Sequence, residues 1–157
     1  MIRTMSVALA ALVMSSSLLF AQPRQLGTFS ELVEALNGGW RVRAVIDYAK
    51  CKLLVDGEEQ ESPAMIGGMD FSSYEYYAPD STANIRAYLV ASETVLINLP
   101  SRGYIYNYVK LNVYDDNTVT ITARYLNPQS LEILMDETFH GSISNGEDEN
   151  GIRFFAQ

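Results

Sequence analysis

Apolar and polar residues alternate with a period of two along residues 104–126, the longest stretch in which pattern and turn chemistry agree. Such alternation is typical of strands with one buried face. Residues 115–117, Asp-Asp-Asn, interrupt it with a three-residue turn, because Asn117 tolerates the left-handed backbone that such a turn needs. The stretch therefore predicts a β-hairpin. Its expected apolar pairs are Val113 with Val119, Leu111 with Ile121 and Val109 with Ala123.

The polar face of this hairpin is a candidate binding surface. Tyr104, Tyr106 and Tyr108 occupy every second position of one strand. In the predicted register Arg124 lies opposite Tyr108, where its guanidinium can rest on the ring. Tyrosines with apolar rings and polar tips can line a concave ligand site. Tyrosine and threonine also favour the solvated face of an ordinary sheet, so both interpretations stay open.

The remaining pattern predicts one helix and further strands. Thr28 and Glu31 form a capping box before a helix that starts at Phe29 and ends at Gly38 and Gly39. We therefore predict a mainly β fold: a single antiparallel meander, strongly curved or closed into a barrel with a lipocalin-like outline, with the N-terminal helix packed on it. The expected strands are 41–48, 65–77, 86–91 and 94–99 as a hairpin around Ser92 and Glu93, 131–140, and 151–155.

The N-terminus has the pattern of a secretory signal peptide, residues 1–21, with a basic Arg3, an apolar core and a small residue, Ala21, at the cut. A membrane anchor is the alternative, but Ser15–Ser17 interrupt the apolar run. Removing 21 residues from the 157 leaves 136, enough for the single domain that we predict at 22–157. We expect an exported protein, periplasmic or extracellular, with no transmembrane segment after cleavage.

Charge excludes several kinds of partner. Without Arg3 the chain has 10 basic and 19 acidic residues, so nucleic acid and anionic membrane surfaces are poor partners. The acidic residues concentrate at 56–61 and 146–150, which lack the spacing of a calcium-binding loop and indicate solvated loops. We expect no metal and no cofactor.

The residues that most often carry chemistry are scarce. His140 is the only histidine and Cys51 the only cysteine, too few for a zinc site, and neither lies in a recognisable nucleophile motif. We therefore assign no catalytic residue and do not expect an enzyme. Cys51 is either a small buried apolar residue or a free thiol that could form an intermolecular bond or take part in redox chemistry.

Residues 29–70 combine three patterns: F-x-x-L-x-x-A-L-x-x-G, V-R-A-V-I-D-Y-x-K-C and P-x-x-x-G-G-M. Together with the turn at 116–119 and the closing 151–154, they resemble the VirK family of small exported bacterial proteins. The resemblance implies export, a link to virulence-associated loci and no established biochemical activity. Residues 142–144 contain no cysteine that could pair with Cys51, so a disulfide found in relatives would be absent here. The matching positions are Phe29, Leu32, Leu36, Gly39, Val42, Ile46, Asp47, Cys51, Gly67 and Gly68.

Two functional hypotheses follow. The first is an exported binding or interaction protein, acting without catalysis on another protein or an envelope component through an exposed sheet face or edge. The second is a carrier of a small apolar ligand, with Tyr104, Tyr106, Tyr108 or their opposite-face neighbours lining a cavity. Asp47 we interpret as structural, pairing with Lys50 or Arg43.

Overall fold

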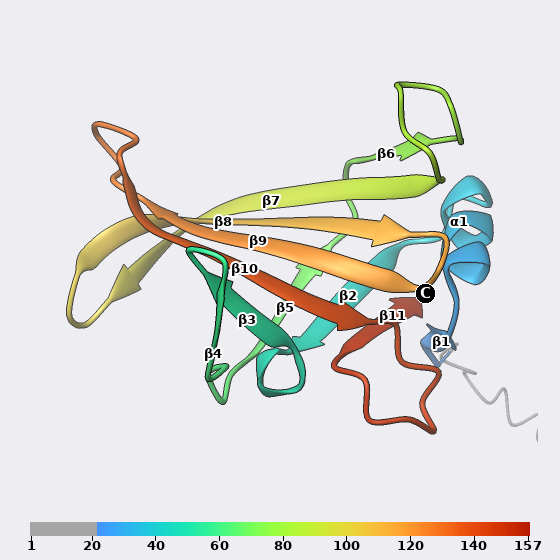
Figure 1. Cartoon of the computed structure of the whole chain (residues 1–157), viewed down its shortest axis with the longest axis horizontal. Coiled ribbons are helices and arrows are strands. Elements are labelled where there is room, and N and C mark those ends of the chain that lie inside the picture. Colours follow the sequence, from blue (N-terminus) through green and yellow to red (C-terminus); the bar gives the residue numbers. More distant parts are fainter. Residues whose placement is uncertain (1–21) are drawn as a thin grey trace, which may run out of the picture.

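The computed structural model describes residues 22–157, and the predicted signal peptide, residues 1–21, lies outside this part of the chain. Within it, one α-helix and eleven strands form two antiparallel sheets that share a core (Figure 1). The mainly β fold with one N-terminal α-helix is therefore confirmed. Among the described residues, no helix is both long and apolar enough to cross a bilayer.

The larger sheet has seven strands in the order β4-β3-β10-β9-β8-β7-β6. Its central strands are long, and they run almost the full length of the molecule in Figure 1. The strands are β3 (Lys52–Val55), β4 (Glu58–Gln60), β6 (Tyr74–Tyr77), β7 (Tyr88–Leu99), β8 (Gly103–Tyr114), β9 (Thr118–Leu126) and β10 (Ile133–Ser142).

The smaller sheet has the order β1-β11-β2-β5, so the prediction of a single meander is wrong. A 3₁₀ turn, η1 (Tyr48–Lys50), separates the sheets after β2, and the last strand returns to lie between β1 and β2. Within residues 22–157 each of the two sheets has two edge strands. No strand pairing there closes a barrel, so the predicted barrel is not confirmed. The strands are β1 (Arg24–Leu26), β2 (Val42–Asp47), β5 (Ile66–Asp70) and β11 (Ile152–Ala156).

The predicted hairpin is confirmed as β8 and β9, with all three apolar pairs in the expected register. Asn117 adopts the left-handed backbone at φ 66°. Leu111, Val113 and Ile121 have no exposed surface, while Val109 is only partly buried. A one-residue slip would move these aliphatic side chains to the solvated face, so the pattern selects its own register.

The predicted hairpin around Ser92 and Glu93 is wrong. β7 continues through both residues, which lie opposite Lys110 and Val109 of β8. The chain turns only after Leu99 and re-enters the sheet at Gly103, whose φ of +71° suits glycine. The predicted strand 65–77 is also divided, because β5 joins the small sheet and β6 joins the large one.

The helix α1 (Phe29–Asn37) closes one end of the core, at the right of Figure 1. Phe29, Leu32, Ala35 and Leu36 are its buried residues. The Thr28 hydroxyl accepts a bond from the Glu31 amide as predicted, but the Glu31 carboxylate accepts from the Gly27 amide.

The β8–β9 turn holds the start of α1. Asn117 Oδ1 accepts a 2.7 Å hydrogen bond from the Phe29 amide, one of the helical donors that lack a partner within the helix. The Asn117 carbonyl accepts a second bond from the amide of Ile143. One residue therefore joins the helix, the β8–β9 hairpin and the end of β10.

Replacement of Asn117 will separate the two roles of this residue. Asn117→Gly keeps the left-handed backbone but loses the bond to Phe29, so it should lower the free energy of unfolding by about 1 kcal/mol. Asn117→Ala adds a strained backbone, so its loss should be about 2 kcal/mol. Asn117→Asp keeps an acceptor beside the helix N-terminus and should stay near the unsubstituted protein. Urea unfolding of the three variants measures how much free energy of unfolding each one loses. Equal losses for Asn117→Gly and Asn117→Asp would contradict the prediction.

Candidate functional site

The two sheets differ in strand length, and this difference leaves a gap. β7 and β8 have 12 residues each, whereas β2 has 6 and β5 has 5. At about 3.3 Å per residue, the long strands extend well past the small sheet, at the end away from α1. Where β2 ends and β5 begins, an inner cleft of about 290 Å³ lies between the sheets. Its lining residues are Ile46, Tyr48, Met65, Ile66, Gly67, Gly68, Ile97, Leu99, Asn107, Val109, Ala123, Tyr125, Met135, Glu137 and Phe139.

Aromatic rings form part of the inner cleft. Tyr48 and Phe139 pack edge to face, with ring centroids 4.8 Å apart, and both residues are buried. Tyr125 of β9 adds a third ring, opposite Asn107 of β8. The cleft is therefore an aromatic and aliphatic site with a few polar groups, the usual composition of a small-molecule site.

Two polar groups of the inner cleft come from different elements, Tyr48 from η1 and Glu137 from β10. Burial, with smaller contributions from Cys51, Tyr125 and Glu137, raises the pKa of Tyr48 to about 12, so this phenol stays protonated at neutral pH. Glu137 is partly buried on the inner face of β10, opposite Ala123. Within residues 22–157 its carboxylate takes part in no ion pair.

The start of β5 forms one edge of the inner cleft. A Cβ atom at Gly68 would lie 2.8 Å from the Ala44 carbonyl oxygen, and one at Gly67 would lie 3.0 Å from the Tyr48 ring. The paired glycines therefore allow a close approach of the β5 backbone to Ala44 and Tyr48. Ile66, beside them, is 68% exposed at the rim.

The predicted tyrosines lie on the opposite, outer face of the large sheet. Tyr104 is exposed, and Tyr106 and Tyr108 are partly buried. Arg124 lies opposite Tyr108 as expected, but it donates to Asp136 at 3.0 Å, so the predicted stacking on Tyr108 is replaced by an ion pair. Their inner-face neighbours Asn107 and Val109, rather than the tyrosines, line the cleft.

A cation–π contact does occur on this outer face, nearer α1. The Arg86 guanidinium lies 4.1 Å from the ring centroid of Tyr114, and it also pairs with Asp116. Tyr88 stacks on Tyr77 with centroids 4.7 Å apart. These residues tie β6, β7 and β8 together, so their aromatic groups have a structural role.

Four apolar residues form an outer row across the large sheet. Leu96 of β7 pairs with Tyr106, Tyr106 with Leu126, and Leu126 with Ile133 of β10. Leu96 is 54% exposed and Ile133 is 52% exposed. The row therefore places contiguous apolar surface in water at the end away from α1.

Cys51 is buried, the first of the two alternatives that the sequence left open. Its sulfur packs beside two glycines, since a Cβ atom at Gly141 or Gly151 would lie 3.1 or 3.3 Å from Sγ. Burial first, and then the charge of Asp47, raise the pKa of the thiol to about 11. The predicted pairing of Asp47 with Lys50 or Arg43 is wrong: Arg43 pairs with Asp70 at 2.7 Å, and within residues 22–157 Asp47 forms no ion pair.

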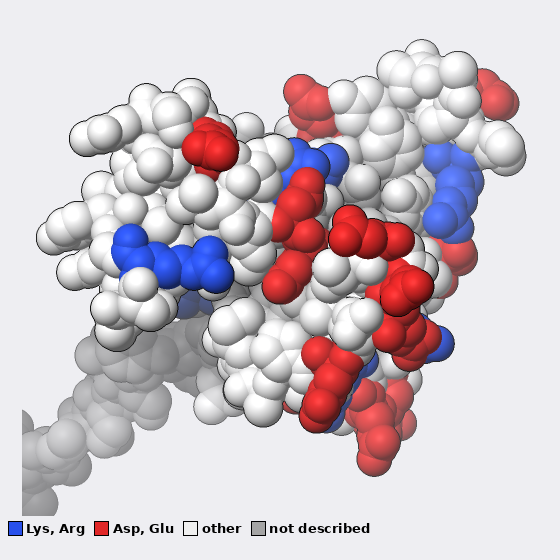
Figure 2. All heavy atoms as spheres, turned by 60° about the vertical axis from the view of Figure 1, so that its left-hand side comes forward, with Lys and Arg blue, Asp and Glu red and all other residues white. Residues whose placement is uncertain are grey.

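Charged side chains are spread over the surface. On the face shown in Figure 2, acidic side chains form several separate groups and basic ones are few. Among residues 22–157, no three histidine, cysteine, aspartate or glutamate side chains lie together as they would around a metal ion. His140 is exposed, with Nδ1 3.4 Å from the hydroxyl of Thr120.

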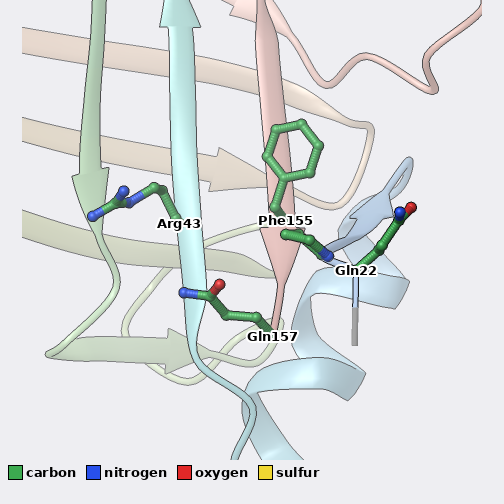
Figure 3. Close-up of a pocket in the computed structure, with 5 residues that line it drawn as sticks. Gln22, Arg43, Phe155 and Gln157 are labelled. Atoms are coloured by element: carbon green, nitrogen blue, oxygen red, sulfur yellow. The ribbon is translucent and has the colours of Figure 1, made fainter. Parts of the chain in front are cut away.

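A second hollow lies on the outer side of the small sheet, beside β1. Gln22, Pro23, Arg43, Phe155 and Gln157 line it (Figure 3). The Arg43 side chain extends toward β5, where Asp70 binds it. This hollow is an open depression, whereas the inner cleft lies between two layers, so the inner cleft is the stronger candidate for a small ligand.

The pattern contained a signal for the inner cleft. Asn107 shares its strand face with Val109, Leu111 and Val113, and Glu137 shares its face with Phe139. A polar residue on an otherwise apolar strand face marks either a buried partner or an opening. Tyr48 and Tyr125 gave no comparable signal, because they meet only through the packing of the two sheets.

Comparison with known proteins identifies a family and a solved structure of similar fold. The family described as "VirK protein" matches residues 25–131. The solved structures include a VirK family protein from Legionella pneumophila, with a TM-score of 0.63, 20% identity, and coverage of 83% of this chain and 98% of that one. At this identity the likeness shows the shared fold. No curated protein matches the chain.

Burial predicts that the Cys51 thiol reacts slowly in the folded protein. A thiol reagent such as DTNB should modify Cys51 at least tenfold more slowly at pH 7.5 than it modifies the same protein in urea, because the thiolate is both shielded and scarce. The chain has one cysteine, so the signal is unambiguous. Rapid, complete labelling of the folded protein would contradict the structure.

Proposed function

We propose that this chain, which belongs to the VirK family, is an exported protein that acts by binding and not by catalysis. The signal-peptide pattern of residues 1–21 supports export to the periplasm or beyond the cell. In this proposal the partner is another protein or an envelope component, and the outer row is the surface that contacts it.

The exposure of the outer row is the observation that carries this proposal. Leu96, Tyr106, Leu126 and Ile133 lie side by side on four hydrogen-bonded strands, so they present a fixed surface. Contiguous apolar surface of this kind marks interaction sites on soluble proteins. Tyr104, 66% exposed and on the same face of β8, extends the row with an aromatic side chain of the type that dominates interface energetics.

A polar residue in the outer row should weaken partner binding without unfolding the protein. Leu96→Ser removes an apolar side chain that is half in solvent, so stability should change by about 0.5 kcal/mol or less. Crosslinking in intact producing cells, followed by purification from the exported fraction, should recover at least tenfold less of the specific partner. The intact mass of the recovered protein should be that of a chain that begins at Gln22.

Val90→Ser is the matched control for this experiment. Val90 lies on the same strand and the same face, opposite Asn112 and nearer α1. The control should keep its crosslinks. Equal losses in the two variants, or no loss in Leu96→Ser, would remove the outer row as the binding surface.

The inner cleft supports a second function, the carrier of a small ligand with an apolar body. In this form of the proposal the curved sheets enclose the ligand as a lipocalin-like barrel would. The supporting observation is the cleft itself, with about 290 Å³ of space, apolar walls and a small number of polar groups. Small-molecule sites in proteins have this composition, and their volumes begin at about 300 Å³.

Filling the inner cleft should displace a carried ligand. Val109→Phe adds a ring to the cleft, whereas Thr94→Phe adds the same ring to the outer face of β7, opposite Tyr108. Native mass spectrometry of gently purified protein should show a retained small molecule in the unsubstituted protein and in Thr94→Phe. Val109→Phe should retain at least tenfold less. If the unsubstituted protein carries no added mass, the carrier function is wrong.

A further inference from the structure

An acidic side chain stands in the inner cleft without a basic partner. Three residues at alternate positions of β10 share one face of the strand and line the cleft: Met135, Glu137 and Phe139. No lysine, arginine or histidine is among the residues that line the cleft. A carboxylate that is partly shielded from bulk water is stabilised by a positive charge, and no residue that lines the cleft supplies one.

The walls around this carboxylate also suit a positive charge. Tyr48, Tyr125 and Phe139 present three rings to one small space. The negative face of an aromatic ring attracts cations, and rings grouped around a site are used to bind quaternary ammonium ligands. Tyr125 already has a cation near it, since the guanidinium of Arg102, from the β7–β8 turn, lies 6.0 Å from its ring centroid.

We infer that the inner cleft binds a small amphiphile with a cationic head, a protonated or quaternary amine, held by Glu137 and the aromatic rings, with a short apolar body against the aliphatic wall. This inference rests on the proposed carrier function, and it specifies the charge of the ligand. Ile97, Leu99 and Met135 supply the aliphatic wall.

The same geometry disfavours other apolar ligands. A fatty acid would bring its carboxylate beside Glu137, and the repulsion of like charges is strong where water is partly excluded. Arg102 is not among the residues that line the cleft, so it could attract such an anion only from outside the cleft. The volume of about 290 Å³ is at the lower limit for ligand pockets, so the cleft accommodates one short chain and not the paired chains of a membrane lipid.

Probes with one tail and three heads will test the charge preference. Octyltrimethylammonium, octanol and octanoate have the same apolar body, and isothermal titration calorimetry measures their affinity for the purified protein. We expect octyltrimethylammonium to bind at least tenfold more tightly than octanoate, with octanol between them. This comparison uses the unsubstituted protein, so it does not depend on whether a variant folds.

Neighbouring carboxylates on β10 provide the matched variants. Glu137→Gln keeps the shape of the side chain and removes the charge, and it should abolish most of the preference for octyltrimethylammonium. Asp136→Asn makes the same change on the outer face, where Asp136 pairs with Arg124, and it should keep the preference. Thermal unfolding checks that both variants are folded.

The outcomes separate the inference from the carrier function. If the three probes bind equally, or octanoate binds most tightly, the cleft is a carrier site and the cationic preference is wrong. If no probe binds, the carrier function and the inference both fail. Binding of octyltrimethylammonium that is lost equally in Glu137→Gln and Asp136→Asn would place the charge effect on the whole acidic surface and would overturn the role of Glu137.

Discussion

The difference in length between facing strands determines how this molecule is organised. A sheet face can be buried only where another layer lies against it. The small sheet covers part of the inner face of β7, β8, β9 and β10, and there the buried side chains of both sheets form one core. Beyond the ends of β2 and β5, the long strands continue without a facing layer. The inner cleft lies at this boundary, between the ends of β2 and β5 and the inner face of the long strands.

The two ends of the large sheet are consequently packed differently. At one end α1 covers the core, and Asn117 joins helix and strands through hydrogen bonds to Phe29 and Ile143. At the other end the strands carry exposed apolar residues on their outer face, such as Leu96, and the mostly apolar inner face includes a carboxylate, Glu137. The exposed apolar row and the inner cleft both lie toward this end of the sheet, and this is the reason for assigning function there.

The sequence predicted the local elements of this fold better than their assembly. The β8–β9 register was predictable because Leu111 and Ile121 are close in sequence and a slip would expose them. The insertion of β11 between β1 and β2 was not, because Phe154 pairs with Ala44 and Leu26, more than a hundred residues away, and no local pattern records such a pairing. The turn after Leu99 was missed for a local reason. The pattern suggested a turn at Ser92 and Glu93, but these residues can also occupy a strand.

The candidate sites show the same division between local and distant information. The outer-face position of Tyr104, Tyr106 and Tyr108 followed from period two alone, as did their separation from the buried face. The inner cleft needs Tyr48 from η1 and Gly67 from β5 as well as Glu137 from β10, and only folding brings them together. Because alternate residues of the same strands face the outer row and the cleft, the two sites share a backbone but no side chains. Chemistry at one can therefore be changed without substituting a residue of the other, whereas a change in strand curvature acts on both.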